Sequence, residues 1–508
     1  MRSFWRQNTL LVLSLVSLFI FSLLVFLDTP TFYEQIEGAS LWVRRWFGTF
    51  YLYLGLFCVL FILIVALSPL GKRKLGKPTD QPEHSTWGWI AMLYSAGMGA
   101  GILLRAVQEP VYMKLHPPLA TGVAPNIMAL EYTFYQWGFT AWAFYGLFAI
   151  VIGYYFFVKE KTSLVSTIIE DKTSSVLAIY SIDLLAVITT VFGLMGAIGL
   201  GTTQINGGLT HLYDQPLGIE VTIALTLLIS LLAFVSVWSG INKGIRVISK
   251  INILVTLLLF LFIFFQTNLV KVFSTFIQAL YHYLVDFIPL SLAYGKFDPG
   301  EAFLTDWTYY YWAFWLAWAP FTGIFIARIS KGRTLREILI GVLLIPSLGT
   351  FFWFSVFGDT AFQLIDNGLT SPQAFSDVFS SIFVFFQNYP LQGLINSITI
   401  FLLVSFLVTS VDSAVFVLSM FTDGGRAYPS RRHRLIWSVA VAIFAVALLI
   451  LGNARPDTDV LIALQKLLII TSLPFALLMV LMTVLFLRDF LKKQSHQKKK
   501  WQSKADLP

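Results

Sequence analysis

Long apolar runs separated by short polar segments dominate the chain. Many of these runs reach about 20 residues, the length of an α-helix that crosses roughly 30 Å of hydrocarbon. From the runs and the residues that interrupt them, we predict membrane spans at 8–27, 50–70, 86–108, 132–157, 176–204, 220–240, 248–267, 307–328, 337–357, 389–420, 434–451 and 464–487. The pattern predicts an all-α polytopic membrane protein with about twelve transmembrane helices.

Basic residues alternate regularly between the spans. Every second polar segment is rich in Lys and Arg, whereas segments 205–219 and 358–388 contain neither. Because Lys and Arg gather in cytoplasmic loops, this alternation predicts a multi-pass protein of the cell membrane with both termini in the cytoplasm. The first apolar run follows Arg2 and Arg6 and lacks a small-residue cleavage site. We therefore interpret that run as a membrane helix and not as a signal peptide.

Composition narrows the function. The chain is 57% hydrophobic and 12% charged, which excludes a water-soluble protein. The net charge of +8 lies in loops, where it sets orientation, so we expect no nucleic-acid partner. Cys58 is the single cysteine and cannot form an intrachain disulfide. The six histidines fall outside the predicted spans, and no phosphate-binding Gly-Lys-Ser/Thr loop or catalytic cluster is visible, so we expect neither an enzyme nor a resident cofactor.

The third predicted span contains three alternating glycines, Gly97, Gly99 and Gly101, around Met98. Small residues in membrane helices often serve close helix packing. Three glycines within five residues also make unwinding inexpensive, and an unwound segment exposes backbone groups with which many transporters hold ions and charged substrates.

Two spans carry aromatic stripes. Trp137, Trp142 and Tyr145 lie within one arc of roughly 140° on a helix, and Trp312, Trp315 and Trp318 recur every third residue. Indole rings on two facing helices suit a quaternary ammonium group, which has no N–H to donate and is attracted to ring faces. The alternative is packing at the membrane interface, where Trp is enriched.

The tenth predicted span holds Thr409, Ser410, Asp412 and Ser413 inside apolar sequence. Hydroxyl and carbonyl oxygens at this depth suit an alkali cation, although such hydroxyls also bond to carbonyls of their own helix. A carboxylate inside a membrane usually faces a cavity or a partner, which makes Asp412 a candidate functional residue.

Four blocks of the chain carry a resemblance to a known family. The blocks are Gly97–Gly101 with Glu109 and Pro110; Trp137–Phe139 with Trp142 and Tyr145; Trp315–Phe321 with Ile326–Arg333; and Thr409–Ser413. In this order they resemble the betaine/carnitine/choline transporter family, the secondary carriers of trimethylammonium compounds, and the resemblance runs nearly end to end.

The resemblance implies a sodium-symporter-like fold with inverted five-helix repeats and two additional N-terminal helices. It divides the chain into 1–85, an N-terminal cytoplasmic segment with two peripheral helices; 86–267, the first repeat; 268–302, an outer amphipathic helix and loop; 303–488, the second repeat; and 489–508, a basic cytoplasmic tail. It also implies a homotrimer in the lipid bilayer. Segment 268–290 supports the amphipathic helix, because Gln278, His282 and Asp286 interrupt its apolar sequence.

The resemblance also implies the site residues. Trp137, Trp142, Tyr145 and Trp315 correspond to a central aromatic box, with Trp312 and Trp318 further along the permeation path. Backbone N–H groups at Gly97, Met98, Gly99 and Gly101 would face a substrate carboxylate. Phe406, Thr409 and Ser410, with backbone carbonyls of Ser95 and Met98, correspond to a sodium site. No cofactor other than Na⁺ as the coupling ion is expected.

Several positions bear on coupling and substrate. Asn252 stands where sodium-independent relatives carry Arg, which favours sodium, and Gly101 stands where choline carriers have Asp, which favours a zwitterion. Gly196 and Ala197 replace small hydroxyl residues and argue against a second sodium site. Arg105 stands where an aromatic residue is usual. It could anchor an anionic group of the substrate, or it could pair with Glu109 at i+4.

The sequence thus favours a sodium-coupled importer of glycine betaine or a similar trimethylammonium zwitterion, with osmoprotection as its role. The alternative is a sodium-independent or proton-coupled carrier or exchanger of choline, carnitine or a sulfated or sulfonated relative, which Arg105 keeps open. A receptor that binds such a ligand without transporting it is the competing interpretation from another class.

Overall fold

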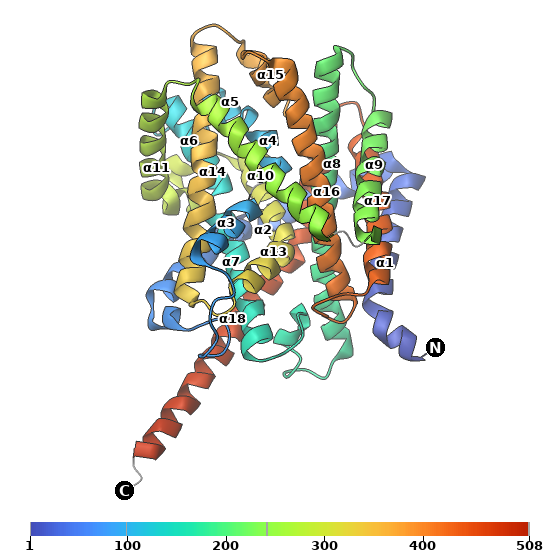
Figure 1. Ribbon diagram of the computed structural model, residues 1–508, viewed down its shortest axis with the longest axis vertical. Helices are drawn as coiled ribbons and strands as arrows, with labels where there is room; N and C mark the ends of the chain where they lie inside the picture. The colour runs from blue at the N-terminus through green and yellow to red at the C-terminus, as the bar shows by residue number, and fades with distance from the viewer. Residues whose placement is uncertain (1, 98, 240–241, 506–508) are drawn as a thin grey trace.

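Helices account for the regular structure of the chain, apart from one isolated β-bridge between Lys74 and Thr334. The computed structural model describes residues 2–97, 99–239 and 242–505, and Figure 1 shows the helices running side by side over most of that chain. The all-α class predicted from the apolar runs is therefore confirmed.

Eleven helical segments in the described part of the chain are long and apolar enough to cross a membrane. They are α1 (Arg2–Leu27), α2 (Thr29–Leu67), α6 (Pro125–Trp137) with α7 (Phe139–Gly153) and the π-helical η2 (Tyr154–Val158), α8 (Val176–Tyr213), α9 (Ile219–Ser239), α10 (Asn242–Phe264), α12 (Glu301–Phe303) with the π-helical η5 (Leu304–Tyr309) and α13 (Tyr310–Ile329), α14 (Leu335–Asp366), α16 (Gln392–Thr422), α17 (Arg431–Gly452) and α18 (Val460–Ala505). The chain is thus a multi-pass membrane protein.

The remaining predicted span, 86–108, is interrupted. It consists of α3 (Thr86–Gly97), α4 (Ala100–Arg105) and α5 (Gln108–Leu115), which follow one another up the bundle in Figure 1. This explains why eleven candidate spans in the described residues stand against about twelve predicted spans. The second predicted span was too short, because α2 begins at Thr29 and not at 50: Asp28 caps it by accepting the backbone N–H of Thr31.

The predicted span 132–157 is also broken, between Trp137 and Phe139. A Cβ on Gly138 would lie 2.5 Å from the ring of Phe351 on α14 and 2.6 Å from the carbonyl oxygen of Phe134. Only glycine fits in this space, and the chain breaks at this glycine: α6 ends at Trp137 and α7 begins at Phe139. The break places the Trp137 side chain at the end of a helix.

Shorter elements connect the spans. They are the 3₁₀ turns η1 (Pro69–Lys72), η3 (Val165–Ile168), η4 (Gly295–Phe297) and η6 (Pro372–Phe375), and the helices α11 (Leu269–Leu292) and α15 (Ser381–Phe386). The amphipathic helix predicted over 268–290 is α11, which packs one apolar face against α6 and α14 and exposes Ile277 and Tyr281 on another. Its polar residues exclude it from the candidate membrane spans.

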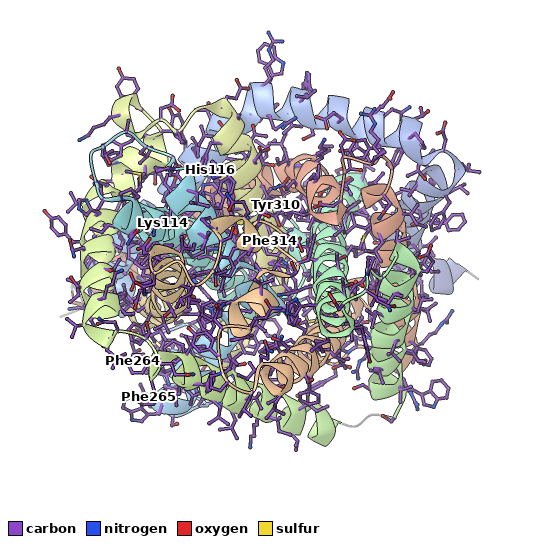
Figure 2. All side chains as sticks on the ribbon, turned by 90° about the horizontal axis from the view of Figure 1, so that it is seen from above. Lys114, His116, Phe264, Phe265, Tyr310 and Phe314 are labelled. Carbon is purple, nitrogen blue, oxygen red and sulfur yellow. The ribbon has the colours of Figure 1, made fainter. Side chains whose placement is uncertain are left out.

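The outer surface of the bundle is apolar, as expected where hydrocarbon is the solvent. Phe265 and Leu231 are among its exposed side chains. Seen along the bundle in Figure 2, Phe264 and Phe265 lie at the rim, whereas Tyr310 and Phe314 lie in the interior. The interior is therefore where polar and aromatic groups can meet away from lipid.

The two ends of the bundle differ in charge. One end, the basic end, carries the loops 68–85, 159–175, 330–334 and 423–430, and the opposite end, the acidic end, carries 214–218 and 367–391. At the basic end the β-bridge joins two of these loops: the N–H of Leu75 donates to the carbonyl oxygen of Arg333 at 2.8 Å, and the N–H of Leu335 donates to that of Arg73 at 2.7 Å.

Candidate functional site

The interrupted third crossing opens the backbone in the middle of the bundle. Helix α3 ends at Gly97 and α4 begins at Ala100, while Gly99 is extended with φ −151° and ψ −175°. Since the first N–H groups of a helix have no partner within it, the break leaves backbone donors unpaired in the helix at the start of α4. The chain thus leaves the helical conformation within the glycine series. Met98 and the side chain of Ser95 lie outside the described residues.

A cavity of about 790 Å³, which we call the aromatic cavity, lies beside this break. Its wall includes Gly99–Gly101 and aromatic side chains of three helices, namely Trp137, Trp142, Tyr145, Phe314, Trp315, Trp318 and Phe321. The cavity extends to Arg328, Tyr428 and Pro429 at the basic end. It therefore connects the middle of the bundle with one of its two ends.

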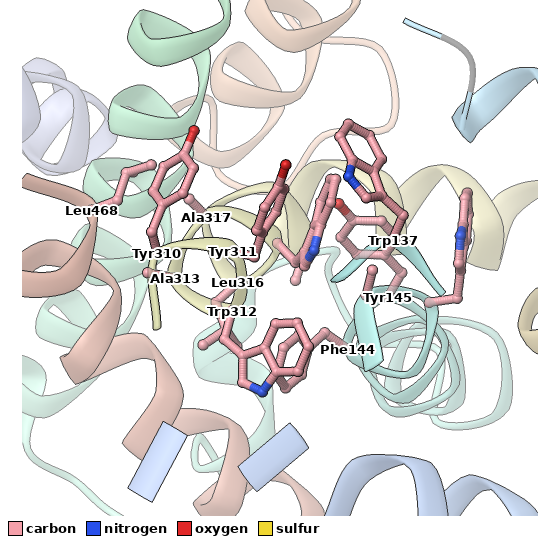
Figure 3. Close-up of a cluster of buried hydrophobic side chains, with 14 of the residues drawn as sticks. Trp137, Phe144, Tyr145, Tyr310, Tyr311, Trp312, Ala313, Leu316, Ala317 and Leu468 are labelled. Carbon is pink, nitrogen blue, oxygen red and sulfur yellow. The ribbon is translucent and has the colours of Figure 1, made fainter. Parts of the chain in front are cut away.

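Four predicted aromatic residues meet at this cavity. The ring centroids of Trp137 and Trp315 are 5.1 Å apart, those of Tyr145 and Trp315 are 6.4 Å apart, and those of Trp142 and Tyr145 are 5.4 Å apart. Figure 3 shows Trp137 and Tyr145 close together at the end of the aromatic cluster. All four side chains are at least 91% buried. Such desolvated ring faces attract an organic cation.

The structure does not place Trp312 with these rings. Its side chain is completely buried, its ring lies 5.1 Å from that of Tyr135, and it is not among the described residues that line the aromatic cavity. Three residues of helix rotate by about 300°, so Trp312 and Trp318 differ by about 120° around α13. The stripe predicted from the sequence is therefore too wide to face one cavity, and Trp315 and Trp318 alone reach it.

Glu109 holds part of the aromatic wall in place. This carboxylate is fully buried, accepts the indole N–H of Trp137 at 3.1 and 3.2 Å, and accepts the hydroxyl of Tyr311. The indole N–H of Trp315 donates at 2.9 Å to the carbonyl oxygen of Gln136. Two rings of the wall are thus oriented through their N–H groups. Sequence reasoning missed this role of Glu109, although it quoted Glu109 within a motif.

Arg105 lies in a second cavity, of about 660 Å³, which we call the charged cavity. Its polar lining includes Glu37, Arg44, Arg105, Gln108, Asp306, Asp377, Asp459 and Lys466. Arg105 donates to the amide oxygen of Gln108 at 2.7 Å, and its guanidinium lies 5.0 Å from the ring of Trp307. No direct ion pair among the described residues joins Arg105 to Glu109, although the two charges interact through space, and Arg105 does not line the aromatic cavity.

The predicted sodium ligands on α16 lie at the wall of the aromatic cavity. Phe406, Thr409 and Ser410 line it on one side, and Gly99–Gly101 line it as well. The Thr409 hydroxyl donates to the carbonyl oxygens of Ser405 and Phe406, both at 3.0 Å. This is the helix-internal bonding that the sequence left open, but the hydroxyl oxygen retains lone pairs for a cation.

Two buried amides in the same wall have polar atoms without hydrogen-bond partners among the described residues. Both polar side-chain atoms of Gln204 and the amide nitrogen of Asn252 are unpaired among the described residues. The Asn252 oxygen accepts the Ser405 hydroxyl at 2.6 Å. Unpaired buried amides are costly unless a ligand or water bonds to them, so Gln204 is a candidate binding residue. Sequence reasoning missed it, although a lone Gln in an apolar span was the available signal.

Asp412 lines the aromatic cavity and has a partner. Its carboxylate lies 3.6 Å from a guanidinium nitrogen of Arg434, and the Ser236 hydroxyl is 3.5 Å away. Both alternatives that the sequence gave for this carboxylate therefore hold at once. The pair stands where the cavity approaches the basic end.

The chain is similar to known membrane transporters over most of its length. Residues 9–495 match the model of the betaine/carnitine/choline family transporters. The chain is 36% identical to a glycine betaine transporter of Bacillus subtilis, over 93% of this chain and 92% of that protein. It is 34% identical to an ectoine/hydroxyectoine transporter of Virgibacillus pantothenticus (89% and 91%) and 33% identical to an osmo-dependent choline transporter of Acinetobacter baylyi (92% and 69%).

The match covers both interrupted helices and every wall of the aromatic cavity, and the relatives are named as transporters and not as enzymes. The chain belongs to the betaine/carnitine/choline family of transporters.

Proposed function

We propose that this protein is a sodium-coupled importer of glycine betaine or a similar trimethylammonium zwitterion that works by alternating access. The observation that carries the proposal is the aromatic cavity, in which ring faces, an opened backbone and hydroxyl groups share one wall. A trimethylammonium group bound among Trp137, Trp142, Tyr145 and Trp315 gains about 1–2 kcal/mol for each desolvated ring face.

The substrate carboxylate would be held next to the rings, by donor groups in the same wall of the aromatic cavity. Backbone N–H groups at Gly99–Gly101 and the unpaired amide nitrogens of Gln204 and Asn252 are donors in the same wall. They suit an anionic group close to the cation. Glycine has no methyl groups to contact the rings, so we expect it to bind poorly. Position 101 also leaves room, because a Cβ there would lie 3.6 Å from Trp137.

The coupling ion would bind between α16 and the interrupted third crossing. Phe406, Thr409 and Ser410 line the wall that also contains Gly99–Gly101. An ion at this junction would contact both α16 and the opened backbone at Gly99–Gly101. Because the substrate would bind to the same backbone, ion binding and substrate binding would be coupled. One sodium ion moving down a membrane potential contributes about 2.3 kcal/mol per 100 mV.

The charge asymmetry of the two ends supports an orientation in the membrane. Lys and Arg loops lie on the cytoplasmic side of membrane proteins, so we infer that the basic end and both termini are cytoplasmic. The aromatic cavity reaches that end at Arg328, Tyr428 and Pro429 and would be open to the cytoplasm. We further propose a homotrimer, as the family resemblance implies, and a role in osmoprotection.

The decisive experiment is uptake of labelled glycine betaine into proteoliposomes, with and without an inward sodium gradient. Choline, carnitine, choline sulfate and ectoine serve as competitors. Accumulation of betaine that requires sodium supports the proposal. Uptake that does not depend on sodium, or a preference for choline sulfate, supports the sodium-independent alternative. The bond of the Thr409 hydroxyl to a carbonyl of its own helix is consistent with that alternative. Binding without accumulation would identify a receptor.

Substitution of the two hydroxyl residues tests the coupling separately. In Thr409→Ala with Ser410→Ala, we expect sodium stimulation to be lost while sodium-independent binding of betaine persists. Ser397→Ala is the matched control, since Ser397 is on the same helix, also bonds to a carbonyl of its own helix, and is outside both cavities. Equal sodium dependence in the double variant and the control would contradict the sodium site.

A further inference from the structure

A third group of polar side chains lies away from both cavities, between α6 and α11. Glu131 of α6 and His282 and Asp286 of α11 each direct one nitrogen or oxygen atom to a common point, and these atoms lie within 4.8 Å of one another. Figure 1 shows α6 and α11 next to each other, and the two helices are in contact. The cluster joins a membrane-spanning helix to the amphipathic helix that covers it.

Glu131 lacks the partner that its burial requires. The residue is 2% exposed, and one carboxylate oxygen is buried without a hydrogen-bond partner among the described residues. No described ion pair includes it, and Asp286 beside it is another carboxylate. A buried carboxylate is costly unless it is paired, protonated or bound to a metal. A buried carboxylate without a hydrogen-bond partner, with one oxygen within 4.8 Å of an imidazole nitrogen and of a second carboxylate, points to a cation.

The spacing of the α11 side chains suits metal ligands. His282 Nδ1 and Asp286 Oδ2 are 3.4 Å apart, which is long for a hydrogen bond. Two ligands at about 2.0–2.2 Å from a tetrahedral ion lie roughly 3.3–3.5 Å from each other. The His282 and Asp286 side chains are 30% and 19% exposed, so the cluster opens to the surface of the protein. The i to i+4 spacing places both ligands on one face of α11.

We propose that Glu131, His282 and Asp286 form a binding site for a divalent transition-metal ion of the Zn²⁺ type. One imidazole and two carboxylates suit Zn²⁺ better than Mg²⁺, which prefers an octahedral shell of oxygens. The bound ion would neutralise the two carboxylates and fasten α11 to α6. Tyr283, next to His282, accepts the backbone N–H of Phe139 at 2.9 Å. The metal would therefore stabilise the helix that contacts the chain break beside Trp137.

The test uses the full chain, purified in detergent without a histidine tag and treated with a chelator. Zn²⁺ binding is measured by competition with a chromophoric chelator, and the melting temperature is measured with ZnCl₂ or MgCl₂. We expect one Zn²⁺ per chain and a higher melting temperature with ZnCl₂ but not with MgCl₂. Glu131→Gln and His282→Gln should each raise the Zn²⁺ dissociation constant at least about tenfold.

His211→Gln is the matched control, because His211 is another partly exposed histidine near the acidic end but is outside the cluster. It should bind Zn²⁺ as the unmodified chain does. The proposal is overturned if Zn²⁺ does not raise the melting temperature, or if both cluster variants bind Zn²⁺ as tightly as the control. Should Glu131→Gln fail to fold, the partly exposed His282→Gln still decides the question.

Discussion

The two cavities of this transporter have opposite chemistry. The aromatic cavity is bordered by indole and phenol rings, with few charged groups apart from those near the basic end, such as Asp412 and Arg434. The charged cavity is bordered by carboxylates and by the cations Arg44, Arg105 and Lys466. A charged wall suits a hydrated solute, whereas an aromatic wall suits a solute that has lost its water. From this difference we propose that a substrate is attracted in the charged cavity and selected in the aromatic cavity.

A row of stacked rings connects the two cavities. Phe303, Trp307, Tyr311 and Trp315 follow at intervals of four residues, with ring centroids 6.1, 6.4 and 5.8 Å apart and interplanar angles of 20°, 25° and 23°. Trp307 lines the charged cavity and Trp315 lines the aromatic one. Glu109 bonds to Tyr311, between the two. The predictions below test whether this division between attraction and selection is real.

Loss of the Glu109 carboxylate should have the largest effect. Glu109→Ala leaves the buried Trp137 N–H and Tyr311 hydroxyl without their acceptor, at a cost of about 1–3 kcal/mol each. A total of roughly 3 kcal/mol corresponds to about a hundredfold lower uptake efficiency. Glu109→Gln keeps one acceptor oxygen and should lose less. Initial uptake rates over a range of betaine concentrations measure both, with the melting temperature as the control for folding.

The two tryptophans of the ring stack should differ in their effect on the betaine KM. Trp315→Leu removes one ring face from the proposed cation site, worth about 1–2 kcal/mol, and should raise the betaine KM about 5- to 30-fold. Trp307→Leu removes a similar ring from the charged cavity and should change KM much less. The two KM values, measured side by side, decide this. Equal increases would mean that both cavities select the substrate.

Selectivity within the aromatic cavity should respond to position 101. Gly101→Asp adds a carboxylate beside Trp137, where a Cβ meets the ring at an ordinary contact distance of 3.6 Å. The new negative charge favours a bare cation and repels a carboxylate, so we expect the preference for betaine over choline to shift about tenfold towards choline. Competition between the two labelled substrates measures the shift. An unchanged ratio would show that the substrate binds away from Gly101.

The charged cavity should contribute least. Arg105→Gln removes a cation that is paired with Gln108 and stacked on Trp307. Arg105 is buried, but it lines the charged cavity and not the aromatic cavity, so its loss removes no contact with the proposed substrate site. We expect less than about a fivefold change in betaine uptake, which corresponds to about 1 kcal/mol. A loss as large as that of Trp315→Leu would place Arg105 in the selective site.

Local sequence signals predicted much of this arrangement. Apolar runs gave the spans, and the glycine series located the break between Gly97 and Ala100, because both depend on residues that are close in sequence. The Gly138 break was not predicted, and the ring that approaches this glycine, Phe351, lies on a helix that is distant in sequence. The second predicted span began too late, at 50, because the polar residues of 29–49 masked a helix that starts at Thr29.

Side-chain partners were harder to predict than helices. The spacing of Arg105 and Glu109 suggested a pair, but Glu109 bonds instead to Tyr311, 202 residues away. Trp312 was grouped with Trp315 from their spacing, but its ring packs against that of Tyr135 and does not line the aromatic cavity. Such choices depend on contacts between distant helices. Periodicity along one helix cannot supply them.

The β-bridge at the basic end limits how α13 can move. The last residues of α13 lead directly into segment 332–335, which forms hydrogen bonds with Arg73 and Leu75. This end of α13 is therefore anchored to the loop after α2. A helix fixed at one end behaves as a lever. At 1.5 Å per residue, Trp315 lies about 22 Å from Ser330 along α13, and Trp307, in the π-helical turns before α13, lies farther from it. The same small rotation about the anchored end would therefore displace Trp307, in the charged cavity, farther than Trp315, in the aromatic cavity.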